Sequence, residues 1–330
     1  MKKTKFISLL AIATAAAALG SCKEKAKWQI GILLPVEHSA LQTCANGFIE
    51  GLKESGLKEG TDFSIEIKNA AGKDADLQNF AKQLVTSKNM TFGLGTGASQ
   101  ALKSASIDKG SLNPVLFSAV TDPVDAGLVE SLENGKGFVT GSSDAQPITE
   151  QIALIKECLP EADKIGIIYT QSETNSKIQA DQAEAAAELA GMSVERKTVT
   201  GPGDISTTAL ALASVEGIDA IYVPTDNNIA ANMNAVKEAA NSKHVLVVAG
   251  EEGMLSSGGH ITLSIDYKEL GKRTGEVAAQ ILKGEKKAYE VPVITMTKED
   301  CKFVYSSANL ASSGITLPQN VLDKCEDISK

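Results

Sequence analysis

The chain has 330 residues, of which 43% are hydrophobic and 22% charged, and these fractions are typical of a globular protein. Asp and Glu outnumber Lys and Arg by 41 to 32, which gives a formal net charge of −9. This acidity disfavours nucleic acid and anionic membrane surfaces as partners. The length exceeds what one hydrophobic core usually organises, so we expect two domains.

The N-terminus has the pattern of an export signal. Three lysines precede an apolar stretch at 6–19, which is too short to span a bilayer. The stretch ends in Leu-Gly-Ser before Cys22, and this arrangement resembles the signal of bacterial lipoproteins. We therefore expect a signal peptide over 1–21, acylation of Cys22 with chains such as palmitate, and a lipidated tether over 22–27. The body would then lie outside the cytoplasm, on the periplasmic face where two membranes exist. An ordinary cleaved signal is the alternative.

Four cysteines follow Cys22, at widely separated positions: Cys44, Cys158, Cys301 and Cys325. No two of them form a C-x-x-C pair, so zinc and thioredoxin-like chemistry have no local support. We expect buried thiols, with one disulfide in the later half of the chain as the open alternative.

Short apolar runs alternate with helical periodicity from residue 30 onward. Runs typical of buried strands lie at 30–34, 63–67, 91–94 and 115–117. Apolar residues at helical spacing lie between them, at 40–55, 77–85 and 98–107. This alternation predicts βαβ units and a parallel sheet.

The same pattern restarts after 141–147. The predicted strands lie at 165–169, 194–199, 220–223 and 245–249, and the predicted helices at 148–159, 176–189, 206–213, 228–240 and 267–282. The fold class is therefore α/β, with two doubly wound parallel-sheet lobes, each a three-layer αβα sandwich, joined by hinge crossings. We assign 28–143 and 252–288 to the first lobe, and 144–251 and 289–330 to the second.

Parallel strands of both lobes would direct their carboxyl ends at a shared cleft. Thr96 and Ser99 lie in a glycine-rich turn that opens a helix, where hydroxyls and free N–H groups suit a carboxylate. Asn175 lies in a similar turn of the second half. A tight turn or a helix cap is the alternative for each of them.

Acidic residues follow several of the predicted strands. Asp226 comes directly after the strand 220–223, where its carboxylate could accept an ammonium group. Asp122 and Asp266 hold comparable positions. Each of the three could instead cap a helix.

Several runs together resemble the ABC-transporter substrate-binding proteins of the tryptophan/tyrosine-binding type. The most specific is Phe-Ser-Ala-Val-Thr-Asp-Pro-Val-Asp-Ala-Gly-Leu-Val at 117–129, and the others are Val-Thr-Gly-Ser-Ser-Asp at 139–144, Tyr-Val-Pro-Thr-Asp-Asn at 222–227, Ile-Asp-Tyr-Lys-Glu-Leu-Gly at 265–271, Ile-Gly-Ile at 30–32 and Glu-His at 37–38. The chain departs from the family at Ser39, where proline is common, and at 170–171, where Asn-Pro is common. The resemblance runs from about residue 30 to residue 317.

The resemblance implies a periplasmic-binding-protein type I fold that closes on a small solute by hinge motion. It implies an amino acid as ligand, an aromatic one first, and an ABC permease as partner. Asp226 or Asp122 would hold the ammonium group, and Thr96, Ser99 or Asn175 the carboxylate. The expected ligand-binding residues are Glu37, His38, Thr96, Ser99, Thr121, Asp122, Ser143, Asn175, Thr225, Asp226 and Asp266.

Three other functions remain as alternatives: a sugar or nucleoside as ligand, an adhesin or sensory lipoprotein, and an enzyme. The aromatic content of 4% disfavours a sugar, because sugar sites usually stack aromatic rings on the ligand. Catalysis has little support, because the chain has three histidines and no Gly-x-Ser-x-Gly motif. We expect a monomer that is not an enzyme and has no cofactor, no metal and no nucleic-acid partner.

Overall fold

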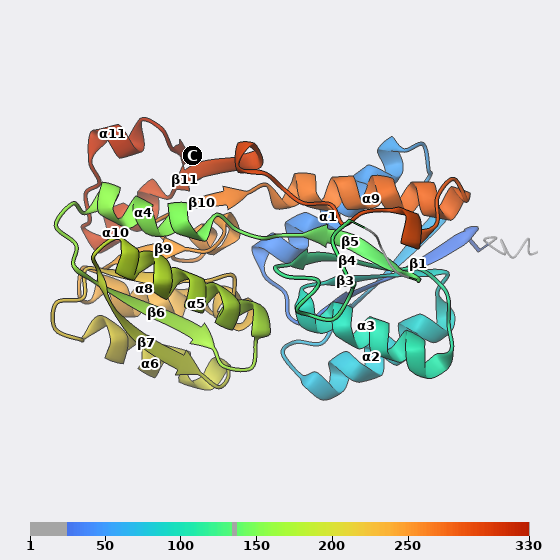
Figure 1. Cartoon of the computed structure of the whole chain (residues 1–330), viewed down its shortest axis with the longest axis horizontal. Helices are drawn as coiled ribbons and strands as arrows, with labels where there is room; N and C mark the ends of the chain where they lie inside the picture. Colours follow the sequence, from blue (N-terminus) through green and yellow to red (C-terminus); the bar gives the residue numbers. More distant parts are fainter. Residues whose placement is uncertain (1–24, 134–136, 330) are drawn as a thin grey trace, which may run out of the picture.

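The computed structural model describes residues 25–133 and 137–329. The predicted signal peptide and Cys22 lie outside the described residues. Two lobes lie side by side (Figure 1). Among the helices of the described residues, none is long and apolar enough to cross a membrane.

The first lobe is built on a five-stranded parallel sheet with the order β2-β1-β3-β4-β5. The strands are β1 (Trp28–Leu34), β2 (Phe63–Asn69), β3 (Met90–Leu94), β4 (Val115–Val120) and β5 (Val139–Ser143). Every residue of β3, β4 and β5 is buried. Continuous burial is typical of a parallel sheet that helices cover on both faces.

Helices cover both faces of this sheet (Figure 1). One face packs against α1 (Ser39–Glu54) and α9 (Tyr267–Lys283), and the other against α2 (Asp74–Ser87) and α3 (Thr96–Lys109). The result is the three-layer sandwich that the alternating sequence pattern predicted.

The second lobe has a seven-stranded sheet with the order β12-β11-β10-β9-β8-β6-β7. The strands are β6 (Lys164–Thr170), β7 (Ser193–Val199), β8 (Ala220–Val223), β9 (Leu246–Ala249), β10 (Ile261–Ile265), β11 (Cys301–Tyr305) and β12 (Glu326–Asp327). All neighbours are parallel except β10 and β11.

The helices of the second lobe are α4 (Ile148–Cys158), α5 (Thr174–Leu189), α6 (Ile205–Ala213), α7 (Asn227–Ala231), α8 (Met233–Asn241), α10 (Ser307–Ser313) and α11 (Gln319–Leu322). Short 3₁₀ helices lie at Pro202–Asp204, Glu252–Ser256, Ala288–Glu290 and Lys298–Asp300. The helix predicted at 228–240 is two helices. The side chain of Asn232 donates to the carbonyl of Asn228 at the break, at 2.8 Å, and such local bonding competes with regular helix.

The chain passes between the lobes three times, after β5, after β10 and before β11. The predicted boundary at residue 252 is wrong in one respect, because β10 pairs with β9 and β11 in the second sheet. The segment before β11 also differs, since Val291 and Val293 pack in the cores of the first lobe. Both errors have one cause: an apolar segment shows that it is buried, but it does not show which sheet or core it joins.

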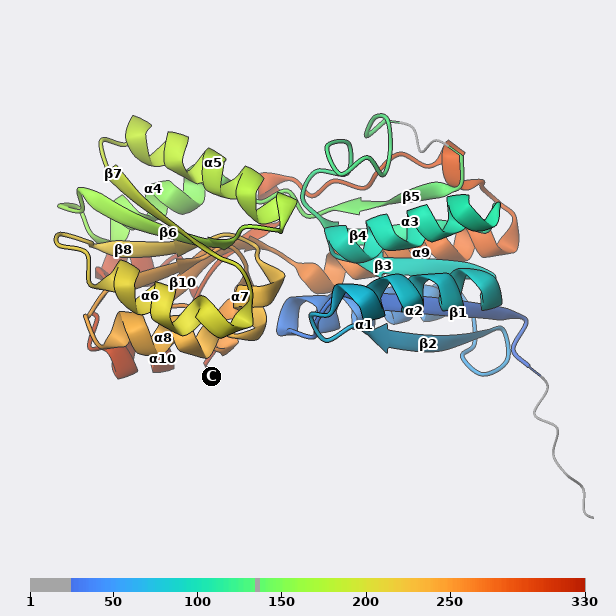
Figure 2. The ribbon, with the colours of Figure 1, turned by 90° about the horizontal axis from the view of Figure 1, so that it is seen from below.

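The carboxyl ends of both sheets face the gap between the lobes. In Figure 2 the arrowheads of β2 and β5 point toward the second lobe. The loops that follow β1, β3, β4, β6, β8 and β9 therefore meet at one place, as expected for ligand sites of open α/β sheets. The four cysteines of the described residues are free thiols, of which Cys44 and Cys158 are buried.

Candidate ligand-binding site between the lobes

Two adjoining cavities lie between the lobes. The inner chamber holds about 290 Å³, part of it open to solvent, and is lined by His38, Leu41, Ala119, Asp144, Asn175, Thr225, Asp226, Asn227, Ala230, Glu251, Met254 and Tyr267. The outer pocket holds about 730 Å³, part of it open to solvent, and is lined by Pro35, Val36, Ala70, Gly72, Lys73, Asp74, Leu77, Thr96, Gly97, Gln100, Ser172, Glu173, Thr174, Asn175, Asn227 and Asn228. Both cavities are lined by Asn175 and Asn227, so they adjoin at these two residues.

The inner chamber carries three buried carboxylates, Asp144, Asp226 and Glu251. No lysine or arginine is among its lining residues, as far as the structure describes the chain. His38 adds no charge near neutral pH, because burial lowers the pKa of its imidazole to about 4. The chamber therefore holds three buried acidic groups and, among its described lining residues, no cation to balance them.

The carboxylate of Asp226 is held within the second lobe. It accepts hydrogen bonds from the backbone N–H of Thr170 at 2.6 Å and the hydroxyl of Thr170 at 2.8 Å. It also caps α7, by accepting the N–H of Ile229 at 2.9 Å. Burial still raises the pKa of Asp226. These contacts occupy both carboxylate oxygens, so Asp226 combines a structural role with its place in the lining.

Asp144 lies on the first crossing between the lobes, and Tyr267 begins the helix after the second crossing. The Tyr267 hydroxyl donates to Oδ2 of Asp144 at 2.7 Å, and the Thr121 hydroxyl donates to Oδ1 at 3.2 Å. Burial raises the pKa of Asp144, and burial also holds the pKa of Tyr267 well above its usual value. The hinge is thus tied together by a buried polar network at the base of the inner chamber.

Glu251 follows β9 and is only 2% exposed. Its Oε2 accepts the backbone N–H of Gly253, whereas its Oε1 is buried with no hydrogen-bond partner among the described residues. Burial raises the pKa of Glu251 to about 8. A buried, unpaired carboxylate oxygen is costly in a folded protein, so it indicates a missing donor.

The outer pocket is bordered by the N-terminal ends of α2, α3 and α5. In the part of the chain that the structure describes, the N-cap residues of these three helices make no side-chain capping bond, and free N–H groups at helix starts favour anions. The Thr96 hydroxyl at the start of α3 is buried and has no hydrogen-bond partner among the residues that the structure describes. Glu173 lies on the other side, where it accepts the backbone N–H groups of Asn227 and Asn228 at 3.0 Å, and burial raises its pKa to about 8.

The backbone at Ala119 is strained where β4 reaches the inner chamber. Ala119 has a φ of 55°, and the register between β4 and β5 shifts between Phe117 and Val120. A left-handed alanine is rare and costs about 1–3 kcal/mol, and such strain is concentrated at functional sites. The bulge places the Ala119 side chain in the chamber wall.

The structure brings five of the eleven predicted residues into the lining of the cleft: His38, Thr96, Asn175, Thr225 and Asp226. Thr121 and Ser143 lie buried behind it, where the Ser143 hydroxyl donates to the Thr121 carbonyl at 3.0 Å. Ser99 is fully buried, and its hydroxyl donates to the Gly95 carbonyl at 2.7 Å.

The other three predicted residues lie away from the two cavities. Asp122 is exposed and accepts the N–H groups of Val124 and Asp125. Asp266 caps α9, by accepting the N–H of Glu269 at 3.0 Å. Glu37 lines a further hollow of about 380 Å³, which shares His38, Ala230 and Glu251 with the lining of the inner chamber.

The sequence reasoning missed Asp144, Glu251 and Tyr267. Asp144 and Tyr267 belong to the runs at 139–144 and 265–271 that resemble the family, but neither is among the predicted ligand-binding residues. Glu251 follows a predicted strand at 245–249, just as Asp226 follows one at 220–223. The rule that selected Asp226 would therefore have found Glu251.

Comparisons with known proteins agree on one family. A family model described as "ABC transporter substrate binding protein" matches residues 29–328. A curated relative from Clostridioides difficile, named "Tyrosine-binding protein", is 37% identical over 278 residues, which are 84% of this chain and 78% of the relative. A solved structure from Streptococcus pneumonia, an ABC domain in complex with L-Trp, is 34% identical, with a TM-score of 0.84 over 92% of this chain and 99% of that one.

A second solved structure shows a relative without ligand, in an open form. It is the ligand-free, open form of a substrate-binding protein with adhesive properties from Clostridium difficile, 32% identical over 92% of this chain and 99% of that one. Its TM-score is 0.67, against 0.84 for the L-Trp complex at a similar identity. The present structure as a whole is therefore more similar to the ligand-bound relative than to the ligand-free, open one.

Proposed function

The chain belongs to the family of ABC transporter substrate-binding proteins, and we propose that it captures an amino acid between its lobes and delivers it to an ABC permease. The observation that supports this proposal is the different electrostatic character of the two ends of the cleft. Its inner chamber is acidic, and its outer pocket is bordered by uncapped helix N-termini. A zwitterion matches that division of charge.

We propose an aromatic amino acid as the first ligand to test. The named relatives support this choice, since one is called tyrosine-binding and another was solved with L-Trp. Apolar side chains are available in both cavities, namely Leu41 and Met254 in the inner chamber and Pro35, Val36 and Leu77 in the outer pocket. These surfaces can bury a ring while polar groups hold the two charged groups.

Binding would act by hinge closure. In this account the ligand's carboxylate meets the Thr96 hydroxyl and the N–H groups at the start of α3 in the first lobe. Its ammonium group meets the carboxylates of the inner chamber, which come from the hinge and the second lobe. Contacts to both lobes favour the closed arrangement, which the permease would then recognise.

We propose that the chain is exported and anchored by lipid. The support is the N-terminal pattern, in which 1–21 would be removed, Cys22 acylated and 22–27 left as a tether. Expression of the unaltered chain and Cys22→Ala in a bacterial host tests this. The unaltered chain should sediment with membranes and carry acyl chains at its N-terminus by mass spectrometry, and Cys22→Ala should be released. Equal sedimentation of both would contradict the anchor.

A thermal unfolding screen tests the ligand class. The full chain, stripped of ligand by unfolding and refolding, is heated with each amino acid and with a set of sugars and nucleosides. A ligand at 100 times its dissociation constant adds about 2.7 kcal/mol to the free energy of unfolding, which gives a clear rise in Tm. We expect the rise for aromatic amino acids, with the ligand recovered unchanged, because we propose no chemical reaction. A rise for sugars or nucleosides alone would refute the assignment.

A further inference from the structure

Glu251 differs from the other two carboxylates of the inner chamber. Both oxygens of Asp144 accept hydroxyl donors, and both oxygens of Asp226 accept donors from the second lobe. Glu251 is the member of this trio whose Oε1 has no partner among the described residues, although the atom is buried. The chamber thus has one acceptor position open, next to the hinge.

The chamber also lacks a countercharge. Its described lining contains no lysine and no arginine, and the neutral ring of His38 supplies none. Removing carboxylates from water without a cation is strongly unfavourable, and a cation delivered by the ligand would offset that cost. The preference of the whole cleft for a positively charged ligand also depends on the donors that the outer pocket provides for a carboxylate.

The outer pocket offers a carboxylate much weaker recognition. Lys73 is the single cation of its described lining, which holds no arginine, and Asp74 and Glu173 lie in the same lining. The remaining donors are the Thr96 hydroxyl, amide side chains and backbone N–H groups. Neutral donors bind an anion less strongly than a bidentate arginine does. The cleft as a whole therefore favours positive charge on the ligand.

From these contrasts we propose that the inner chamber is a primary-ammonium site in which Glu251 sets the ligand class, so that the amine contributes more to binding than the carboxylate. This inference rests on the proposed function. The chamber is the smaller cavity, at about 290 Å³ against about 730 Å³ outside, which suits a compact charged head with the side chain in the outer pocket. Aromatic amines without a carboxylate then belong to the ligand class, and acids without the amine do not.

The position of the site also links recognition to closure. Asp144 lies on one crossing, Tyr267 begins the helix after another, and Glu251 comes from the second lobe. An ammonium group seated between Asp144 and Glu251 would bridge the hinge to the second lobe. The proposed site therefore stabilises the closed arrangement directly.

Calorimetric titration of the full, ligand-stripped chain with three matched compounds tests the proposal. They are L-tyrosine, tyramine, which lacks the carboxylate, and 3-(4-hydroxyphenyl)propionate, which lacks the amine. The acid should bind ~100-fold or more weakly than tyrosine, because a buried group left without its charged partner costs that much, and tyramine should lose less. The corresponding tryptophan set is L-tryptophan, tryptamine and indole-3-propionate.

Glu251→Gln keeps the shape of the side chain and cannot take the negative charge that an ammonium group would favour. We expect this variant to lose ~30-fold or more in affinity for tyrosine and tyramine and little for the acid. Asp122→Asn, an exposed carboxylate outside both cavities, is the matched control and should leave all three affinities unchanged.

The outcomes separate the two proposals. If the acid binds as tightly as the amino acid, or if Glu251→Gln weakens acid and amine equally, the ammonium site is refuted while amino-acid binding stands. If neither amino acid binds the unaltered chain, the proposed function itself fails. Should Glu251→Gln not fold, the comparison of the three compounds on the unaltered chain decides alone.

Discussion

Nε2 of His38 lies 3.1 Å from Oδ1 of Asn227, and this contact joins the first lobe to the second across the cleft. His38 follows β1, and Asn227 begins α7. Asn227 is itself oriented by Glu173, whose Oε2 accepts its side-chain amide at 2.6 Å. The contact is therefore a direct, side-chain-specific link between lobes that closure would form and opening would break.

His38→Ala should shorten the lifetime of the closed, ligand-bound state. Loss of one partly buried hydrogen bond costs about 1 kcal/mol, which predicts a roughly fivefold faster dissociation of ligand. Stopped-flow measurement of ligand release provides the test. Asn113→Ala, whose amide donates to the Lys88 carbonyl far from the cleft, is the control. Equal dissociation rates in all three proteins would show that the link does not hold the lobes together.

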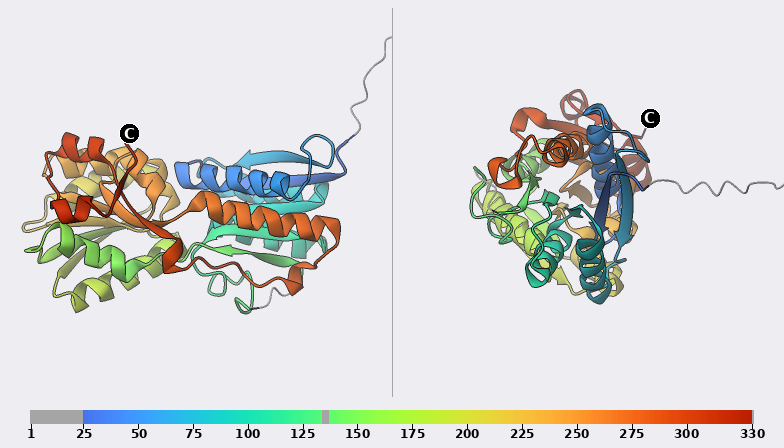
Figure 3. Two further views of the ribbon diagram at one scale, coloured as in Figure 1. Left: turned by 90° about the horizontal axis from the view of Figure 1, so that it is seen from above. Right: turned by 90° about the vertical axis from the view of Figure 1, so that its right-hand side faces the viewer.

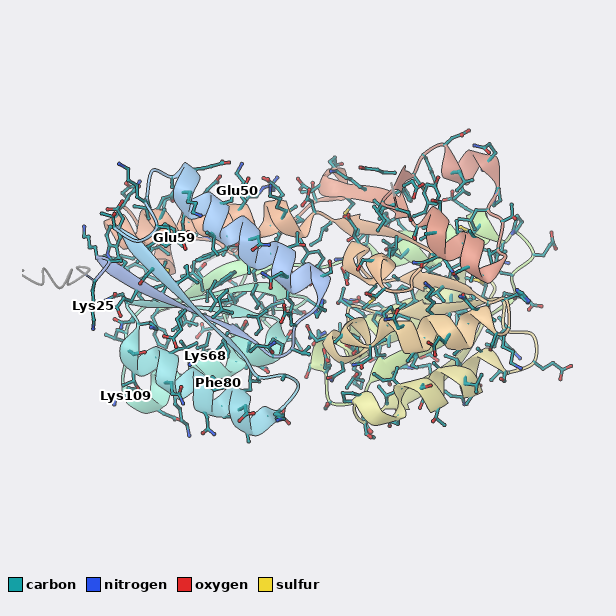
Figure 4. The ribbon with its side chains drawn as sticks, turned by 180° about the vertical axis from the view of Figure 1, so that it is seen from behind. Lys25, Glu50, Glu59, Lys68, Phe80 and Lys109 are labelled. Carbon is teal, nitrogen blue, oxygen red and sulfur yellow. The ribbon has the colours of Figure 1, made fainter. Side chains whose placement is uncertain are left out.

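Helices α1 and α9 run in the same direction in close contact, as the left view of Figure 3 shows. A Cβ on Gly271 would lie 2.0 Å from the Cys44 carbonyl oxygen, and a Cβ on Gly47 would lie 2.1 Å from the Lys268 carbonyl oxygen. Only glycine permits this approach. At the surface of the pair, Lys268 forms an ion pair with Glu50 at 2.9 Å, and Figure 4 labels Glu50 on α1.

Gly271→Ala should therefore lower the free energy of unfolding by about 1–3 kcal/mol, because the added methyl group forces the two backbones apart. Chemical denaturation measures the change. Gly203→Ala is the control, since a Cβ there would meet nothing within 4 Å. A Gly271→Ala protein as stable as this control would contradict the close packing.

We expect the protein to lose stability in mild acid because the imidazole of His260 is buried. It is fully buried, its Nδ1 accepts the N–H of Val247 at 2.8 Å, and burial lowers its pKa to about 4. The unfolded chain binds a proton near pH 6.5 and the folded chain does not, so this contribution to stability falls as pH drops from about 6.5 toward 4.

Between pH 7 and pH 5 the loss from His260 amounts to roughly 2 kcal/mol. His260→Asn keeps an acceptor near the position of Nδ1 and removes the titration. Its free energy of unfolding should decline less than that of the unaltered chain over this range. Comparing the two proteins cancels the opposite contribution of Glu251 and Glu173, whose raised pKa values favour the folded state at lower pH. Parallel declines would refute the assignment.

We expect Cys158 and Cys325 to be the thiols that can form a disulfide, because Cys325 lies near enough to contribute to the raised pKa of Cys158. Both pack in one hydrophobic cluster, and their sequence neighbours Glu157 and Lys324 form an ion pair. We expect oxidised glutathione to join them, each link consuming two thiols and releasing two molecules of reduced glutathione. Burial raises the thiol pKa of Cys158 to about 12, so the reaction should be slow.

Peptide mapping under non-reducing conditions checks this crosslink. Cys44 serves as the control, because it lies buried in the first lobe and should stay a free thiol. Detection of Cys325 only as a mixed disulfide with glutathione would show that the pair lies too far apart to join.

Local sequence patterns were sufficient to predict the helices and strands that have a clear apolar pattern. The helix predicted at 267–282 is α9 at Tyr267–Lys283, and the strand predicted at 30–34 is the core of β1. The alternation of short apolar runs with helical periodicity predicted the parallel sheets. The expectation that Asp226 faces the cleft came from its place after a strand, and it lines the inner chamber.

Tertiary geometry set the features that sequence reasoning missed. The Ser99 hydroxyl turns back to the Gly95 carbonyl, and the direction of a hydroxyl cannot be read from the order of residues. Asp144 and Tyr267 are 123 positions apart and meet only because two crossings lie side by side at the hinge. Glu251 stands out only because its burial and its open oxygen are visible in three dimensions.

If the proposed function is right, the cleft binds an aromatic amino acid. Isothermal titration of the full, ligand-stripped chain with L-tyrosine and with L-tryptophan measures this binding. We expect saturable binding of one molecule per chain for at least one of the two, weakened in Glu251→Gln and unchanged in Asp122→Asn. Absence of heat with both amino acids, at several temperatures and with a folded, refoldable protein, would contradict it.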